Sequence, residues 1–111
     1  TMSEWTHICQ FQDLTPNTGI CALFEEEQVA IFYCQRTEQL YAVNNFDPIA
    51  NASVLSRGIM ASLHGEMYVA SPLYKQHFNL QTGECLEAPE HQLKTYAVRK
   101  KNQQIQLKKA S

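Results

Sequence analysis

The sequence is poor in the residues that most often mark a phosphate loop or a metal site. Only four glycines occur among the 111 residues, and they are scattered instead of forming a loop that would cradle a phosphate. The four cysteines include no C-x-x-C pair, which argues against a zinc ribbon or a thioredoxin-like motif. No apolar stretch approaches the roughly 20 residues that cross a bilayer. We therefore expect no transmembrane helix and no membrane partner.

Signs of secretion are also missing. Residues 1–5 contain no basic stretch followed by an apolar core, so we expect no signal peptide. Disulfides are rare in proteins that are not secreted, and free cysteine is one of the residue types most often buried. The four cysteines are therefore predicted to be reduced and mostly buried thiols: Cys9, Cys21, Cys34 and Cys85.

Charge is unevenly distributed, although the formal net charge is only -2. All eleven acidic residues lie at or before Glu90, whereas basic residues gather after it. Such a basic ribbon would suit an acidic partner, but also a solvated, lysine-rich edge that discourages aggregation. Because no basic motif is interleaved with aromatic residues, we do not expect nucleic-acid binding. The basic residues of the ribbon are Lys94, Arg99, Lys100, Lys101, Lys108 and Lys109.

What the sequence does contain is a succession of short β-rich runs separated by turn residues. Alternating apolar residues are typical of strands with one buried face, and no run of normal helix length shows a helical pattern. The sequence therefore predicts an all-β protein, a sandwich or barrel. Two long connections, 44–58 and 71–77, stand out because such connections are usually functional or mobile. About nine strands are expected, at residues 5–9, 20–24, 28–34, 40–43, 59–63, 67–70, 78–80, 93–99 and 103–107.

The second connection carries the most informative motif. It begins Ser71-Pro72-Leu73-Tyr74 and is followed by Phe78-Asn79-Leu80-Gln81-Thr82-Gly83. This pattern resembles the second cluster-binding box of a Rieske iron–sulfur domain, a Cys-Pro-x-His loop followed by Phe-x-Leu-x-Thr-Gly. Ser71 stands at the cysteine position and Tyr74 at the histidine position. In the first connection, alignment on Asp47-Pro48-Ile49 puts Asp47 and Ile49 at the two positions of the Cys-x-His box.

None of these four residues suits the cluster that the boxes would hold. A Rieske cluster needs two cysteine thiolates on one iron and two histidine imidazoles on the other. Isoleucine cannot coordinate a metal, and carboxylate or hydroxyl oxygens are poor substitutes for thiolate sulfur. The remaining histidines and cysteines show no zinc-like spacing. We therefore expect no metal site and no cofactor in this chain.

With Leu55-Ser56-Arg57-Gly58 upstream, the stretch 70–80 resembles the small subunit of bacterial NAD(P)H-dependent assimilatory nitrite reductase, and the likeness runs from Trp5 to Leu107. The resemblance implies one Rieske-like domain over residues 1–111, a β-sandwich of antiparallel sheets with a small inserted former cluster-binding subdomain at about 44–85. It also implies a cytoplasmic complex whose large subunit carries flavin, a [4Fe–4S] centre and sirohaem and reduces nitrite to ammonium. The chain itself is expected to have no catalytic residues.

The same resemblance predicts a docking surface, because the two loop tips of Rieske proteins face their electron-transfer partner. Tyrosine and arginine are common at the energetic centres of interfaces. Tyr74, Lys75 and Arg57 are therefore the main predicted contacts with the large subunit, and Asp47, Ser71 and His77 are secondary ones. Tyr74 would alternatively fill the space left by the missing histidine and cluster.

Two other hypotheses remain open. One is an atypical iron–sulfur or mononuclear iron centre built from Cys9, Cys34, Cys85 or His77. The other is a stand-alone thiol-redox or ligand-binding β-domain.

Overall fold

The computed structural model describes residues 5–73 and 75–109, and in them eleven strands form small antiparallel sheets. This confirms the all-β, antiparallel prediction. The elements are β1 (Thr6–Gln10), η1 (Phe11–Asp13), β2 (Gly19–Phe24), β3 (Glu27–Cys34), β4 (Gln39–Asn44), β5 (Phe46–Asp47), β6 (Ala52–Ser53), η2 (Leu55–Arg57), β7 (Ile59–Leu63), β8 (Glu66–Ala70), β9 (His77–Asn79), β10 (Tyr96–Lys101) and β11 (Gln104–Lys109).

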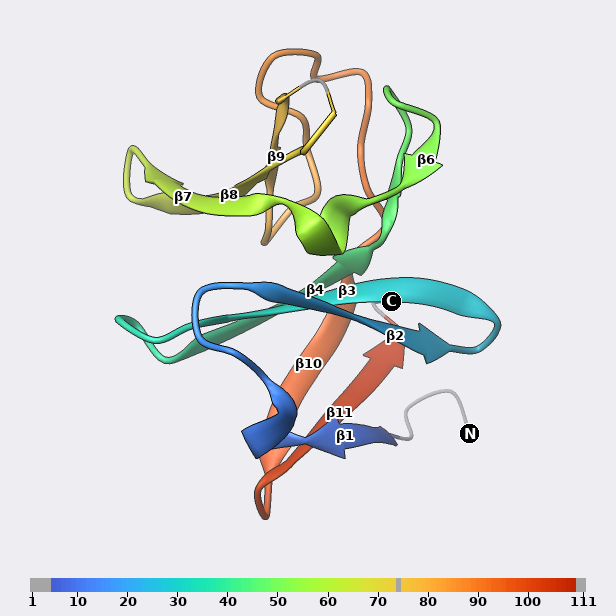
Figure 1. Ribbon diagram of the computed structural model, residues 1–111, viewed down its shortest axis with the longest axis vertical. Coiled ribbons are helices and arrows are strands. Elements are labelled where there is room, and N and C mark those ends of the chain that lie inside the picture. The colour runs from blue at the N-terminus through green and yellow to red at the C-terminus, as the bar shows by residue number, and fades with distance from the viewer. Residues whose placement is uncertain (1–4, 74, 110–111) are drawn as a thin grey trace.

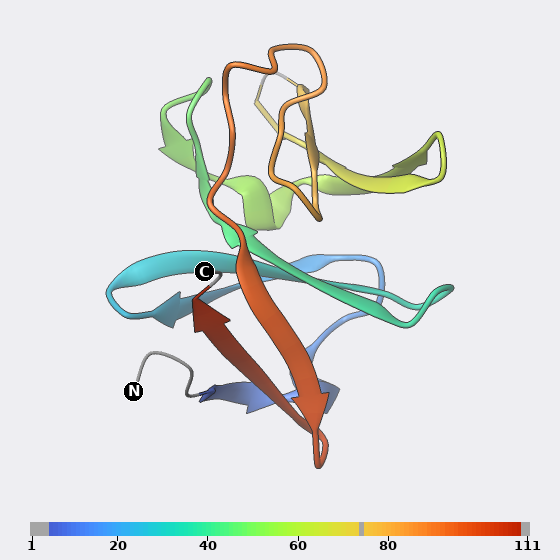
Figure 2. The same cartoon turned by 180° about the vertical axis from the view of Figure 1, so that it is seen from behind.

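The strands build three layers, as Figure 1 shows. Sheet β1-β11-β10 forms the base, sheet β2-β3-β4 lies in the middle, and β5 to β9 with η2 form an upper layer. The view from behind in Figure 2 shows the same order and the single long descent of the chain from the upper layer into β10. The base and the upper layer therefore cover opposite faces of one middle sheet.

β3 is the central strand of the middle sheet, and its successive side chains pack alternately into the two cores on either side of that sheet. Val29 and Ile31 belong to the core against the base, whereas Ala30 and Phe32 belong to the core beneath the upper layer. All four are fully buried. This follows from the period of two along a strand, because a sheet covered on both faces needs apolar residues at every position.

Polar contacts join the chain's entry into the upper layer to its exit. The backbone N–H of Asn44 donates to Lys94 O at 2.8 Å, and Lys94 pairs with Glu27 at 2.8 Å. The hydroxyl of Tyr96 donates to the same Glu27 oxygen at 2.7 Å. Burial and, next, the hydrogen bond to this carboxylate raise the pKa of Tyr96 well above its ordinary value.

The structure differs from the predicted strands mainly at their ends. β5 and β6, of two residues each, fall within the long connection 44–58, for which the sequence predicts no strand. β10 begins at Tyr96 and runs to Lys101, so the final hairpin turns at Asn102 and Gln103. Both turn residues have positive φ values of 53° and 64°. This backbone geometry matches the tight two-residue turns that suit antiparallel strands.

The prediction for the cysteines is wrong at one position. All four thiols are free, with Cys34 and Cys85 buried and Cys9 half-buried, but Cys21 is exposed. Cys21 lies on β2, which is an edge strand of the middle sheet, so the upper layer leaves it uncovered. In residues 5–73 and 75–109, no helix is long and apolar enough to cross a membrane.

Candidate functional site

The two connections that resemble cluster-binding boxes meet in the upper layer. Ser71, which follows β8, donates its hydroxyl hydrogen to Asp47 Oδ2 of β5 at 2.5 Å. The two residues are 24 positions apart in sequence, and both are fully buried. Alignment of the boxes assigns them to the two cysteine positions. A direct hydrogen bond thus joins the loops where two thiolates would share one iron.

Asp47 also organises its own loop. Its Oδ1 atom accepts hydrogen bonds from the backbone N–H groups of Ile49 and Ala50, at 2.9 and 3.1 Å. Its carbonyl oxygen accepts from the N–H of Asn51 at 2.7 Å. A short acidic side chain that binds the backbone two residues further on is a common way to fix a turn. The N–H groups of Ile49 and Ala50 and the hydroxyl of Ser71 therefore give the carboxylate three donors, which compensate its burial.

Ser71 has the corresponding role in the second loop. Its N–H donates to Gln76 O at 2.8 Å, and its own carbonyl accepts from the N–H of Lys75 at 3.0 Å. Lys75 adopts a left-handed backbone, with φ of 61°, to complete this closed turn. Tyr74, the predicted main contact, lies outside the described residues.

A pocket of about 400 Å³ opens beside this loop. It gathers four of the six predicted contact residues, Arg57, Ser71, Lys75 and His77, from three separate parts of the upper layer. Asp47 is not among the lining residues, but it is hydrogen-bonded to Ser71, which is. The other lining residues are Ile59, Ala70 and Pro72. The pocket therefore combines two permanent cations with an apolar wall.

His77 is held in place by Glu87. Its backbone N–H donates to Glu87 Oε1 at 2.8 Å, and its ring Nδ1 lies 2.7 Å from Glu87 Oε2. Partial burial would raise the pKa of Glu87, but the hydrogen bonds from His77 outweigh it. The pKa of this carboxyl consequently lies below its ordinary value. The pair fixes one wall of the pocket.

Sequence reasoning missed the apolar and acidic partners of this site. Ile59 has 74% of its surface exposed and Leu73 52%, although both read as ordinary apolar residues of a strand and a loop. Glu87 lies in a connector with no motif. The signal available in the sequence was the Ser71-Pro72-Leu73 motif itself, which presents two apolar residues on a predicted loop.

The residues that the structure describes do not fit a [2Fe–2S] cluster. The side-chain oxygens of Asp47 and Ser71, at the two cysteine positions, are hydrogen-bonded to each other. Ile49 offers no ligand atom at the first histidine position. In the described part of the chain, no group of three or more His, Cys, Asp or Glu residues could hold a metal ion. A Rieske cluster requires sulfur and imidazole donors at these places.

Comparison with known proteins assigns the class of the domain. The family described as the Rieske-like [2Fe-2S] domain matches residues 4–108. The nitrite reductase (NADH) small subunit of Escherichia coli K12 is 47% identical over 107 residues, which cover 96% of this chain and 99% of that protein. The chain therefore belongs to the Rieske-like domain family, in its branch of nitrite reductase small subunits. This confirms the resemblance that the box motif indicated.

Two further relatives bear on the fold and the partner. The solution structure of the nitrite reductase small subunit from Erwinia carotovora superimposes with a TM-score of 0.80 at 46% identity, covering 99% of this chain and 85% of that one. A nitrite reductase large subunit from Klebsiella oxytoca is 35% identical over 101 residues, which are 91% of this chain but only 10% of that protein. A domain of this kind thus also occurs within a much longer chain.

Proposed function

We propose that this chain is the accessory small subunit of an NAD(P)H-dependent nitrite reductase, and that it docks on the large subunit through the pocket end of its upper layer. The complex reduces nitrite to ammonium in nitrate assimilation. In this proposal the flavin, [4Fe–4S] centre and sirohaem belong to the large subunit, and the small subunit carries no cofactor. A cytoplasmic location is part of the same proposal, since NAD(P)H is a cytoplasmic reductant.

The hydrogen bond between Asp47 and Ser71 is the observation that carries the proposal. It maintains the contact between two loops whose usual link is a metal cluster. A frame that keeps its loops together without metal is suited to recognition, because fixed loops present contact residues without an ordering cost on binding. Arg57, Lys75 and His77 are the contact residues that this frame presents at one pocket.

The Klebsiella oxytoca relative supports the choice of partner. There, a segment 35% identical to this chain is part of a protein named as a large subunit. A covalent connection raises the effective concentration of two domains and so favours their contact. A domain that occurs both as a separate small subunit and within a large one is expected to act beside the same partner in both cases.

The first and last strands lie away from the pocket. β1 and β11, the first and last strands, belong to the base, and the middle sheet separates them from the upper layer, as Figures 1 and 2 show. A connection to another domain through either strand would therefore leave the pocket accessible.

An atypical metal centre or a thiol-redox domain remains the alternative function. The candidate ligands do not all converge in the described residues: Cys9 packs against the base core, whereas Cys85 belongs to the core of the upper layer, where it and His77 both contact Glu87. Burial raises the pKa of both thiols, which keeps them less reactive.

Two measurements on purified protein test the proposal. Size-exclusion chromatography of the small subunit with its large subunit is expected to show a stable complex. Iron analysis and visible absorption of the small subunit, prepared without oxygen, are expected to show no stoichiometric iron–sulfur centre. Failure to form a complex would contradict the docking function, and a stoichiometric centre would support the alternative.

A further inference from the structure

Within residues 5–73 and 75–109, the two cations of the pocket form no ion pair. Arg57 and Lys75 are both exposed and line the same pocket. Among the described residues, the ion pairs that form are Lys94 with Glu27 and His77 with Glu87. Neither includes a cation of the pocket. The positive charge of the pocket is therefore not balanced within the part of the chain that the structure describes.

The nearby carboxylates are already engaged. Glu87 binds both the backbone and the ring of His77, and Asp47 is buried beneath Ser71 with three donors around it. Other basic residues of the chain are covered differently. Arg99 and Lys108 lie over the ring of Trp5 at 4.3 and 4.8 Å. Arg57 and Lys75 differ from other exposed cations, such as Arg36 and Lys101, in that they line one pocket.

An apolar surface lies next to these cations. Ile59 and Pro72 line the pocket, and Leu73 follows Pro72 with 52% of its surface exposed. Exposed apolar patches bordered by polar residues mark interaction sites, and arginine is enriched in protein–protein interfaces. A small free anion would cover little of this surface. A carboxylate carried by a polypeptide would neutralise the cations and cover the apolar side chains together.

We propose that the pocket formed by Arg57, Lys75 and the apolar wall of Ile59 and Pro72 receives an aspartate or glutamate side chain of the large subunit. An apolar neighbour of that acid covers Leu73. This inference rests on the proposed function and adds the chemistry of the partner segment. Complementary charge of this kind selects the partner and speeds its association, and it weakens as salt screens the charges.

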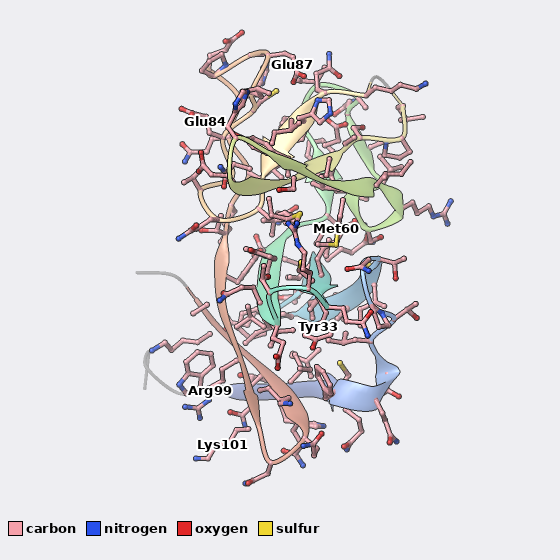
Figure 3. The ribbon with its side chains drawn as sticks, turned by 90° about the vertical axis from the view of Figure 1, so that its left-hand side faces the viewer. Tyr33, Met60, Glu84, Glu87, Arg99 and Lys101 are labelled. Atoms are coloured by element: carbon pink, nitrogen blue, oxygen red, sulfur yellow. The ribbon has the colours of Figure 1, made fainter. Side chains whose placement is uncertain are left out.

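The first test compares two doubly substituted chains that carry the same change in charge. Arg57→Gln with Lys75→Gln removes both pocket cations, whereas Arg36→Gln with Lys101→Gln removes two exposed cations elsewhere. Figure 3 shows Lys101 at the base and Glu87 at the opposite end of the molecule. All four residues are exposed, so folding should be preserved, and thermal unfolding checks it. Affinity for the large subunit is measured by calorimetry at low and at physiological ionic strength.

The pocket substitutions are expected to weaken binding at least about tenfold per cation and to reduce its dependence on salt. The control pair should bind like the wild type. If the pocket pair binds with unchanged affinity and salt dependence, the acid-binding pocket is refuted while docking itself stands. If the wild-type chain does not bind the large subunit at all, the proposed function fails and this inference fails with it.

A second test identifies the partner acid directly. A carbodiimide joins a lysine amine to a carboxylate in contact with it and leaves no spacer, whereas an arginine does not react in this way. The wild-type complex should yield a Lys75 peptide linked to an aspartate or glutamate of the large subunit, detected by mass spectrometry. Lys75→Arg should preserve binding and lose this product, and Lys101→Arg should preserve both. Links through Lys101 with none through Lys75 would overturn the proposal.

Discussion

Removing the hydroxyl of Ser71 is the most direct test of how the two loops are held. Ser71→Ala leaves Asp47 Oδ2 without its donor in a site where Asp47 is fully buried. An unsatisfied buried acceptor costs about 1–3 kcal/mol, and more when it is charged. We expect the free energy of unfolding to fall by about 2–3 kcal/mol. For a domain of this size that corresponds to a melting temperature lower by about 10–20 °C.

Denaturant unfolding followed by circular dichroism measures the loss. Ser53→Ala is the matched control, since Ser53 is exposed on β6, the partner strand of β5. It should change stability by no more than about 0.5 kcal/mol. The reasoning would be refuted if Ser71→Ala cost no more than this control.

A substitution at Asp47 tests the pairing itself. Asp47→Asn keeps a carbonyl oxygen for the N–H groups of Ile49 and Ala50, and its amide can donate to the Ser71 oxygen. In this background Ser71→Ala should cost less, because an unpaired amide is less expensive to bury than an unpaired carboxylate. Equal costs in both backgrounds would show that the two side chains are not coupled.

Three further predictions concern acid, alkali and backbone geometry. Because the pKa of Glu87 is lowered in the folded state, its contribution to stability is present above its ordinary pKa of 4.5 and is lost as the pH falls through the folded value. Glu87→Gln should remove this contribution, so the stability of the variant should depend less on acid than that of the wild type. Equal dependence of both chains on pH would contradict the prediction. Because the pKa of Tyr96 is raised, its contribution is complete below its ordinary pKa of 10.0 and is lost as the pH rises through the folded value; Tyr96→Phe should be less sensitive to alkali than the wild type in the same assay. Gly83 has φ of 85° and an added Cβ would clash with the carbonyl oxygen of Leu93, whereas Gly65 has φ of 81° and open space around it. Gly83→Ala should therefore lower the melting temperature by more than Gly65→Ala, whose cost is limited to about 1–2 kcal/mol of backbone strain; equal shifts would refute the steric argument.

Local patterns in the sequence were sufficient to predict most of the fold. The apolar run in 29–34 located β3, and the alternation of Ile105 and Leu107 located β11, because a strand buried on one face leaves a period of two and a strand buried on both faces is apolar throughout. β5 and β6 could not be predicted, since strands of two residues depend on each other's pairing and not on their own composition. The exposure of Cys21 depends on the position of β2 at the sheet edge, which its apolar neighbours do not reveal.

The candidate site was predictable only in part. Motif alignment placed Asp47 and Ser71 at equivalent ligand positions, but their direct hydrogen bond is a tertiary contact that spacing does not specify. Arg57 and Lys75 were identified as separate candidates, and the structure shows that they line one pocket with Ile59. Their role in binding, like that of Tyr74, stays a prediction.

The double-sided burial of β3 has a consequence for motion. Loss of β3 would remove apolar contacts from both neighbouring layers at once, so we expect the two layers to unfold together. Amide hydrogens of β3 and of β8 should therefore exchange with solvent only through opening of the entire domain, with equal opening free energies. The pocket of the upper layer is then expected to keep its shape whether or not a partner is bound.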